Sequence, residues 1–253
     1  MPLCLVLTLY MARTTSNTVN TNFANDFISS PSFRIRLRKA VSVAWEIFGR
    51  KVGGGLIPVN KEASMQLQYA YVLKQLLPMI LMHPSEKVEV ELETGVRLKG
   101  VSSRNNIDIL VKGDSDKGEF KIAIELKCYR NIASSTKDRG ATNNFMRDMY
   151  VDLDVLERYV EQGIADAGVA LVMNDLHRLV RPKTKTGWCW TAHDISHGFV
   201  FPGGKIPYTT SGPYDVDLKK RYEFQWSEYG DIWFAELEGA ELAEPLDQGK
   251  NGT

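Results

Sequence analysis

Cysteine is scarce in this 253-residue chain, and its spacing excludes two common kinds of scaffold. The three cysteines, Cys4, Cys128 and Cys189, lie far apart and form no CxxC pair. An odd and dispersed set of this kind predicts neither a zinc ribbon nor a disulfide framework. Because a chain without disulfides suits a reducing compartment, the sequence predicts a cytoplasmic protein.

Net charge and long apolar runs are lacking as well. Lys and Arg together number 31, as do Asp and Glu, so the formal net charge is zero. Since many nucleic-acid-binding proteins are basic, the global charge gives that class no support, although a local basic face would serve the same end. The apolar run at residues 2–11 is too short to cross a bilayer and lacks the basic segment of a signal peptide. We therefore expect no membrane partner.

The remaining pattern predicts one α/β domain between two irregular ends. We expect a flexible leader over residues 1–31, a domain over 32–240 and a tail over 241–253. Apolar residues recur at helical spacing in segments 34–50, 60–81 and 143–161. Strand-like patterns occupy segments 88–92, 105–111, 120–127, 168–173, 222–226 and 232–237. The segment 168–173 is apolar throughout and follows a helix, which indicates a buried strand reached by a crossover. The fold class is therefore α/β, with a mixed central sheet flanked by helices.

Two of these strands carry acidic residues among apolar neighbours, where charge is costly unless it is paired or bound to a metal. Asp108 lies in the first strand, and Glu125 and Lys127 lie in the second. Residues two apart in a strand share a face, so Glu125 and Lys127 project together, whereas Asp108 points away from Ile107 and Ile109. The polar connection between the strands is typical of a hairpin, whose antiparallel pairing would bring Asp108 toward Glu125.

A cation is needed if these two carboxylates are neighbours, because they would otherwise repel each other. Mg²⁺ prefers oxygen ligands and keeps several waters, and Mn²⁺ is an alternative, so Asp108 and Glu125 are candidate metal ligands. A lysine beside such a site can position or deprotonate a water, which is the role expected of Lys127. A metal-bound water of lowered pKa and a stabilised phosphate charge are what phosphodiester hydrolysis requires.

The order of these residues and elements resembles the PD-(D/E)xK nuclease superfamily, whose members share the restriction-endonuclease-like fold. The resemblance rests on Asp108 and on Glu125-Leu126-Lys127, and it spans roughly residues 60–175 as an order of elements. It implies that Asp108, Glu125 and the backbone carbonyl of Leu126 hold the metal, and that Lys127 orients the attacking water.

The resemblance also implies an acidic residue from the preceding helix. Glu62 is the best-placed match, although a stabilising acid in the first turn of a helix explains Glu62 nearly as well. The proline that gives the motif its name is absent, since Ile107 stands before Asp108.

A magnesium-dependent DNA endonuclease in restriction or defence is the function that the resemblance implies, and a homodimer that cuts both strands is implied by analogy. The main alternative is a non-catalytic nucleic-acid-binding or assembly module on the same fold. A ribonuclease, and an unrelated α/β protein with a chance motif, are further alternatives.

Three weaker features each have two interpretations. The basic segment 34–51 is either a phosphate-contacting face or a solvated helix face, and the latter is the commoner case. His193 and His197 have a spacing that can chelate zinc on a helix, but the following glycine favours a loop. Trp188 and Trp190 either stack on a base or pack within the fold.

Overall fold

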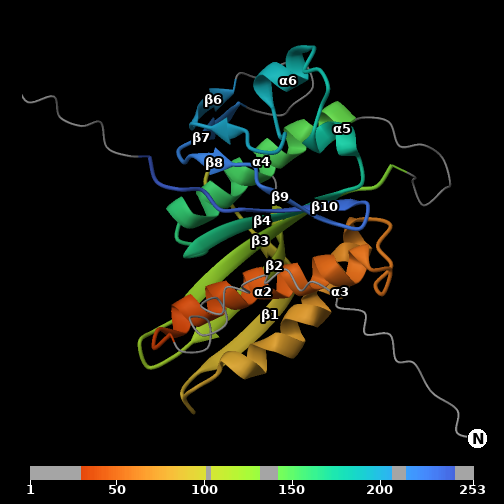
Figure 1. Cartoon of the computed structure of the whole chain (residues 1–253). Helices are drawn as coiled ribbons and strands as arrows, with labels where there is room; N and C mark the ends of the chain where they lie inside the picture. Colours follow the sequence, from red (N-terminus) through yellow and green to blue (C-terminus); the bar gives the residue numbers. More distant parts are fainter. Residues whose placement is uncertain (1–29, 101–103, 132–141, 207–214, 243–253) are drawn as a thin grey trace, which may run out of the picture.

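The fold is described from a computed structural model that covers residues 30–100, 104–131, 142–206 and 215–242 (Figure 1). The leader expected at 1–31 lies outside these residues, apart from its last two positions. The tail expected at 241–253 also lies almost wholly outside them.

A six-stranded sheet with the strand order β1-β2-β3-β4-β10-β9 forms the centre of the molecule (Figure 1). Its strands are β1 (Lys87–Val96), β2 (Asn105–Asp114), β3 (Phe120–Tyr129), β4 (Ala167–Asn174), β9 (Trp226–Tyr229) and β10 (Ile232–Leu237). β3 and β4 pair in parallel, whereas the other neighbours are antiparallel. Helix α4 (Thr142–Glu161) forms the crossover between the two parallel strands. The predicted α/β class with a mixed, helix-flanked sheet is therefore confirmed.

Helices cover both faces of the sheet (Figure 1). Helix α2 (Phe33–Gly53), helix α3 (Glu62–Leu76) and the 3₁₀ helix η1 (Leu77–Ile80) pack on one face, and α4 packs on the other. Alternate residues of β3 divide between the two cores. Ile122 and Ile124 face α2 and α3, whereas Ala123 faces α4. This alternation is the period-two pattern expected for a strand buried on both sides.

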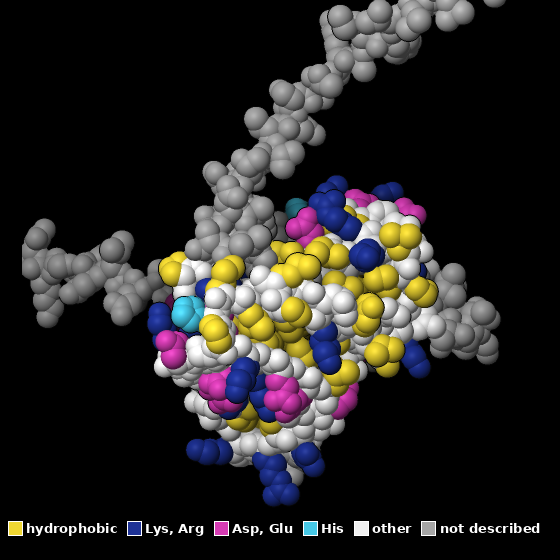
Figure 2. All heavy atoms as spheres, turned by 90° about the horizontal axis from the view of Figure 1, so that it is seen from below, with side chains coloured by type: hydrophobic (Ala, Val, Ile, Leu, Met, Phe, Trp, Pro, Cys, Tyr) yellow, Lys and Arg dark blue, Asp and Glu magenta, His cyan; other side chains and the backbone are white. Residues whose placement is uncertain are grey.

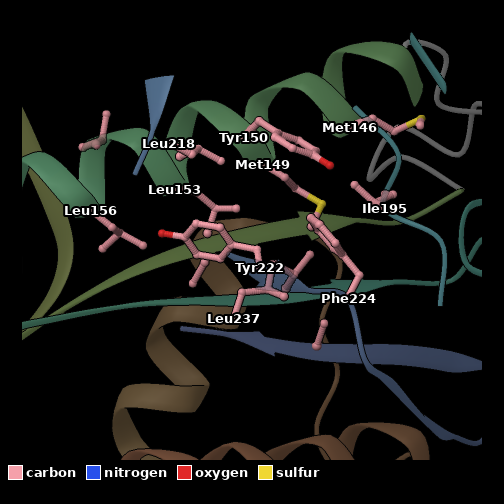
Figure 3. Close-up of a cluster of buried hydrophobic side chains, with 14 of the residues drawn as sticks. Met146, Met149, Tyr150, Leu153, Leu156, Ile195, Leu218, Tyr222, Phe224 and Leu237 are labelled. Atoms are coloured by element: carbon pink, nitrogen blue, oxygen red, sulfur yellow. The ribbon is translucent and has the colours of Figure 1, made fainter. Parts of the chain in front are cut away.

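The segment after β4 forms small elements on the outer side of α4. They are α5 (His177–Val180), α6 (Trp188–Ala192), β5 (Val200–Phe201), β6 (Gly204–Ile206), β7 (Val216–Leu218) and β8 (Tyr222–Glu223). The expectation of one strand over 222–226 was wrong, because Tyr222 pairs with Phe201 whereas Trp226 begins β9. The chain changes partners between them, where Phe224 is fully buried in the core beneath α4 (Figure 3).

Two acids of α4 hold the C-terminal segment in place. Glu157 accepts hydrogen bonds from the backbone N–H groups of Lys219 and Lys220 and from the Tyr222 hydroxyl. Asp154 accepts one from the N–H of Asp217. These carboxylates therefore satisfy backbone donors that would otherwise be left without partners.

Two arginines of α2, Arg36 and Arg38, make contacts that stabilise the fold. Ile35, one of the apolar residues of this helical segment, is 49% exposed, whereas Arg36 is only 2% exposed. The guanidinium of Arg36 donates to the carbonyl oxygen of Ile80 and pairs with Glu86 at 2.6 Å. Arg38 pairs with Glu236 in β10 and with Glu238 just after the strand. Because these arginines are paired with the chain's own acids, a phosphate-contacting face at 34–51 is not favoured.

Apolar side chains are exposed on the side of the molecule that carries α3 (Figure 2). The largest in α3 and η1 are Leu67, Tyr71 and Met79. None of the helices in the described ranges is both long enough and apolar enough to span a bilayer.

Candidate functional site

The site lies where β2 separates from β3. Backbone pairing between these strands extends from Gly113–Phe120 to Ile109–Ile124 and stops there. If the ladder continued, Asp108 would lie opposite Glu125. Instead, Oδ2 of Asp108 accepts a hydrogen bond of 2.7 Å from the backbone N–H of Leu126. The Asp108 carboxylate thus lies in the gap and accepts a hydrogen bond from the N–H of Leu126, at a level where the two backbones no longer pair.

The strand on the other side of Asp108 is irregular at the same level. In β1, Leu92 pairs with Ile109 and Thr94 pairs with Ile107, but the pair between them is skipped. Its β1 member, Glu93, has a φ of 52°, which is uncommon for a residue other than glycine. Such strained backbone is frequent at functional sites.

This irregularity changes the face on which one predicted residue lies. Ile107 was expected to share a face with Ile109, but Ile107 packs in the core beneath α4, whereas Ile109 packs toward α2 and α3. That expectation was wrong because strict alternation requires a continuous ladder, and the ladder is interrupted at Asp108. The interruption frees the Asp108 carboxylate to lie between the strands.

Asp108 has an unfavourable environment for a negative charge. Burial raises its pKa to about 6, and the charges of Glu62 and Glu93 add to the effect. The hydrogen bond from Leu126 and the charge of Lys127 act in the opposite direction. The net result is a carboxylate that lacks sufficient positive charge around it.

Glu125 is held still more strongly in its neutral form. Burial raises its pKa well above the usual range, and the charges of Asp108 and Asp152 raise it further. Its Oε1 atom is buried and has no hydrogen-bond donor of normal geometry among the described residues, although the Tyr159 hydroxyl lies close enough to the carboxyl to lower its pKa to a small extent. A buried oxygen without a donor is costly, so this atom is suited to a ligand that brings positive charge.

Lys127 is the cation nearest to these carboxylates. Its Nζ lies 2.9 Å from Oδ2 of Asp152 on α4 and 3.9 Å from Oε2 of Glu62 on α3. Although burial lowers the pKa of Lys127, Asp152 and Glu62 outweigh this effect and raise it above the ordinary value. The ammonium therefore stays protonated at neutral pH, which favours positioning a water over deprotonating one.

Asp152 completes the cluster from the helix on the other face. Burial raises its pKa to about 7, with Lys127 opposing and Glu62 and Asp108 contributing to the increase. Four carboxylates thus surround one ammonium. Burial is the main reason why three of them, Asp108, Glu125 and Asp152, have raised pKa values, and the negative charges of their neighbours raise the values further.

Side chains from the first two turns of α3 contact the strands on either side of the gap. Oε2 of Glu62 accepts a hydrogen bond of 3.3 Å from the backbone N–H of Cys128. One turn later, Nε2 of Gln66 donates to the backbone oxygen of Asp108 and to Oε1 of Glu93, both at 2.8 Å. The N-cap of α3 is Lys61. Glu62 lies in the first turn, where an acid also stabilises the helix.

An open pocket of about 440 Å³ leads to this gap. It is lined by Lys61, Glu62, Ala63, Gln66, Glu93, Asp108 and Cys128. Asp108 is therefore reached from solvent, whereas Glu125 lies deeper, toward α4. Three of the lining side chains are acidic, which suits a cation or a cation-bridged ligand.

The side chains are not gathered as a finished metal cage. Within the described ranges, no group of three or more His, Cys, Asp or Glu side chains is close enough to hold a metal ion. Asp108 and Glu62 line the pocket, whereas Glu125 and Asp152 lie on the side of α4. Lys127 lies between Glu62 and Asp152.

Asp152 is the member of the cluster that the sequence did not reveal. Its helix carries several acids, and two of them, Asp154 and Glu157, bind backbone N–H groups of the C-terminal segment. The sequence carries one signal for Asp152, which is its spacing: it follows Asp148 by four residues, so both acids lie on the same side of α4. Only the packing of α4 on β3 identifies which acid faces Lys127.

The other sequence candidates lie apart from the cluster. His193 is buried against Tyr150 and Trp188, and burial lowers its pKa to about 4. Nδ1 of His197 accepts a hydrogen bond from the N–H of Trp226. Both histidines belong to irregular backbone after α6, which agrees with the loop interpretation over a helical zinc site.

Comparisons with known proteins give no relative for this chain. No protein-family model, no curated protein and no solved structure matches it. The functional argument therefore rests on the geometry of the site.

Proposed function

We propose that this chain is a metal-dependent nuclease with a restriction-endonuclease-like fold, and that DNA is its substrate. One observation carries the proposal: Asp108 lies in the gap where β2 leaves β3, bonded to the Leu126 N–H and beside Glu125 and Lys127. Carboxylates at the open end of a hairpin, with a lysine two residues after the second, match the arrangement that the motif predicts.

Mg²⁺, or Mn²⁺ in its place, fits the donors of this site. Asp108 and Glu125 are hard oxygen donors, the backbone carbonyl of Leu126 is a third, and Glu62 borders the same pocket. The buried Oε1 of Glu125 and the carboxylates of raised pKa that lie beside it would be stabilised by a divalent cation. When bound, the ion supplies a water of lowered pKa and stabilises charge on the phosphate.

The protein's own contribution is orientation. Lys127 keeps its charge because Asp152 and Glu62 flank it, so its ammonium can hold a water or a phosphate oxygen by hydrogen bonds. Asp152 is a positioning residue, since it acts through Lys127. Burial of Glu125 under α4 excludes bulk water from the deeper side of the gap.

A plasmid-nicking assay with Mg²⁺, with Mn²⁺ and with EDTA tests the proposal. We expect nicking that requires the metal and is lost in Glu125→Ala and in Lys127→Ala. The chain offers a matched control, because Glu119-Phe120-Lys121 repeats the same spacing at the other end of β3. Its Glu119 and Lys121 pair at 2.6 Å near the surface, so replacing them with alanine should leave nicking intact.

The main alternative is a non-catalytic nucleic-acid-binding or assembly module. It predicts DNA binding without nicking under any metal, by wild-type protein that is folded by circular dichroism. That result would overturn the enzyme proposal. A panel of DNA and RNA substrates separates the deoxyribonuclease from a ribonuclease, and a role in restriction or defence requires cleavage of foreign DNA in cells.

A homodimer stays a prediction, because cleavage of both strands of a duplex is simplest with two sites. The exposed side chains of α3 and η1 (Figure 2) offer an apolar surface. Size-exclusion chromatography with light scattering measures the oligomeric state, and a monomer under cleavage conditions would overturn the prediction.

A further inference from the structure

A second pocket, of about 450 Å³, lies between the start of α4 and the segment that follows β4. We call it the α5 pocket. Its lining includes the basic side chains of His177, Arg178, Arg181 and Lys183, together with polar groups of Thr184 and other residues. No Asp or Glu is among the described residues that line it. In a chain of zero net charge, such a segregation of cations is a specific feature of this place.

The cations of the α5 pocket differ from those of α2. Among the described residues, Arg178, Arg181 and Lys183 form no ion pair, whereas Arg36 and Arg38 pair with acids of the chain. All three pocket residues are exposed. Arg181 lies over the ring of Trp233, 5.2 Å from its centroid, so its guanidinium is partly ordered before any ligand arrives.

The chemistry of the lining selects for phosphate. Arginine and lysine supply charge-assisted hydrogen bonds to phosphate oxygens, and threonine hydroxyls and Asn143 add neutral donors. Trp190, which also lines the α5 pocket, offers an aromatic surface for a base or sugar.

The α5 pocket opens at the same end of the sheet as the carboxylate cluster. β3 ends two residues after Lys127, at Tyr129, which pairs with Asn174 at the end of β4. The chain then enters α5 at His177. Along α4, Asp152 is ten residues from Thr142, a rise of about 15 Å. The α5 pocket and the carboxylate cluster thus lie at the two ends of this part of α4.

We propose that the α5 pocket binds the phosphate backbone of the DNA strand that the carboxylate cluster cleaves, to one side of the cut. This inference rests on the proposed nuclease function and adds to it a second contact region. The acidic cluster alone repels DNA. A basic pocket without acids nearby attracts the phosphate backbone and fixes the orientation of the DNA strand across the site.

Binding of a fluorescein-labelled DNA duplex, measured by anisotropy in EDTA over a range of NaCl concentrations, tests the inference without cleavage. The pocket variant is Arg178→Ala with Lys183→Ala and Arg181→Ala. The matched control removes the same charge through Lys74→Ala, Lys87→Ala and Lys117→Ala, which are exposed and remote from the α5 pocket. A second pocket variant keeps Arg181, because its contact with Trp233 contributes to packing.

A plot of log Kobs against log [NaCl] has a negative slope. We expect the triple pocket variant to reduce the magnitude of this slope by about 2 to 3, since each lost phosphate contact removes about one. The double variant should lower it by about 2. The control should keep the wild-type slope and affinity. Circular dichroism and thermal unfolding verify that each variant is folded.

The failures of the two proposals are distinguishable. A wild-type slope in both pocket variants, with wild-type protein that binds and nicks DNA, would overturn the α5 pocket and leave the nuclease proposal standing. Wild-type protein that neither binds nor nicks nucleic acid would overturn both. An equal effect in the control would show a general charge effect and would also overturn the assignment of the pocket.

Discussion

Replacing Asp108 with asparagine should stabilise the metal-free protein at pH 8 and at the same time abolish nicking. The carboxylate of Asp108 is buried and has acidic neighbours, and these raise its pKa to about 6 from the ordinary 3.8. Asparagine has no charge to bury, yet its Oδ1 can still accept the hydrogen bond from the N–H of Leu126. The substitution therefore removes the cost and keeps the contact.

The size of the effect follows from linkage. The folded-state pKa exceeds the unfolded one by about two pH units, and each unit is worth about 1.4 kcal/mol. The folded state thus binds the proton more tightly, so ionisation of Asp108 costs nothing below pH 3.8 and costs progressively more as pH rises to about 6. Above that pH the cost is complete, at roughly 3 kcal/mol.

Urea unfolding in EDTA at pH 8 and at pH 4 measures this difference. We expect Asp108→Asn to exceed the wild type by up to about 3 kcal/mol at pH 8 and to match it closely at pH 4. Added Mg²⁺ should raise the stability of the wild type only, because the variant lacks a proposed ligand. A variant less stable than the wild type at pH 8 would refute the view that Asp108 is an uncompensated charge.

Three further predictions concern other parts of the molecule. Asp152→Asn removes the carboxylate 2.9 Å from Nζ of Lys127, so the pKa of Lys127 should fall and the alkaline limb of the pH–rate profile for nicking should move to lower pH; an unchanged profile would contradict a positioning role. Glu86→Gln leaves the buried Arg36 without its counter-charge and should lower the free energy of unfolding by about 3 kcal/mol in urea; a loss under about 1 kcal/mol would show that the pair is dispensable. Gly230→Ala places a Cβ 2.5 Å from the carbonyl oxygen of Gly53 at a φ of 60°, and calorimetry should show a lower Tm; an unchanged Tm would mean that the turn relaxes freely.

The elements of the fold were largely predictable because their signals are local. Helical spacing identified α2, α3 and α4, and the apolar run after α4 identified β4 and its parallel crossover. The β2–β3 hairpin followed from its polar turn. Helix α2 shows the limit of such patterns, since Arg36 is buried and Ile35 exposed. Burial of an arginine depends on a distant partner, Glu86, which no periodicity reveals.

The sequence predicted that Asp108, Glu125 and Lys127 lie near one another, but neither their geometry nor the contribution of Asp152 could be read from it. Strand alternation predicted that Glu125 and Lys127 project from the same face, and the contact of Lys127 with Asp152 identifies α4 as the helix that packs there. The same alternation placed Ile107 on the wrong face, because it assumes a ladder without interruption. Gln66, which donates to the Asp108 backbone oxygen, and Glu93, which accepts from Gln66, line the same pocket and carry no signal of their own in the sequence.

By itself, the sequence determined which residues lie on which strands, and hence that acids and a lysine stand together in an apolar hairpin. Spacing along one chain is sufficient for that, since strand and helix periods are fixed by backbone geometry. The tertiary structure decided the rest: the separation of β2 from β3, the arrival of Asp152 from α4 and of Glu62 from α3, and the gathering of cations in the α5 pocket. These depend on contacts between segments remote in sequence, and electrostatic energies depend on distance and burial in three dimensions.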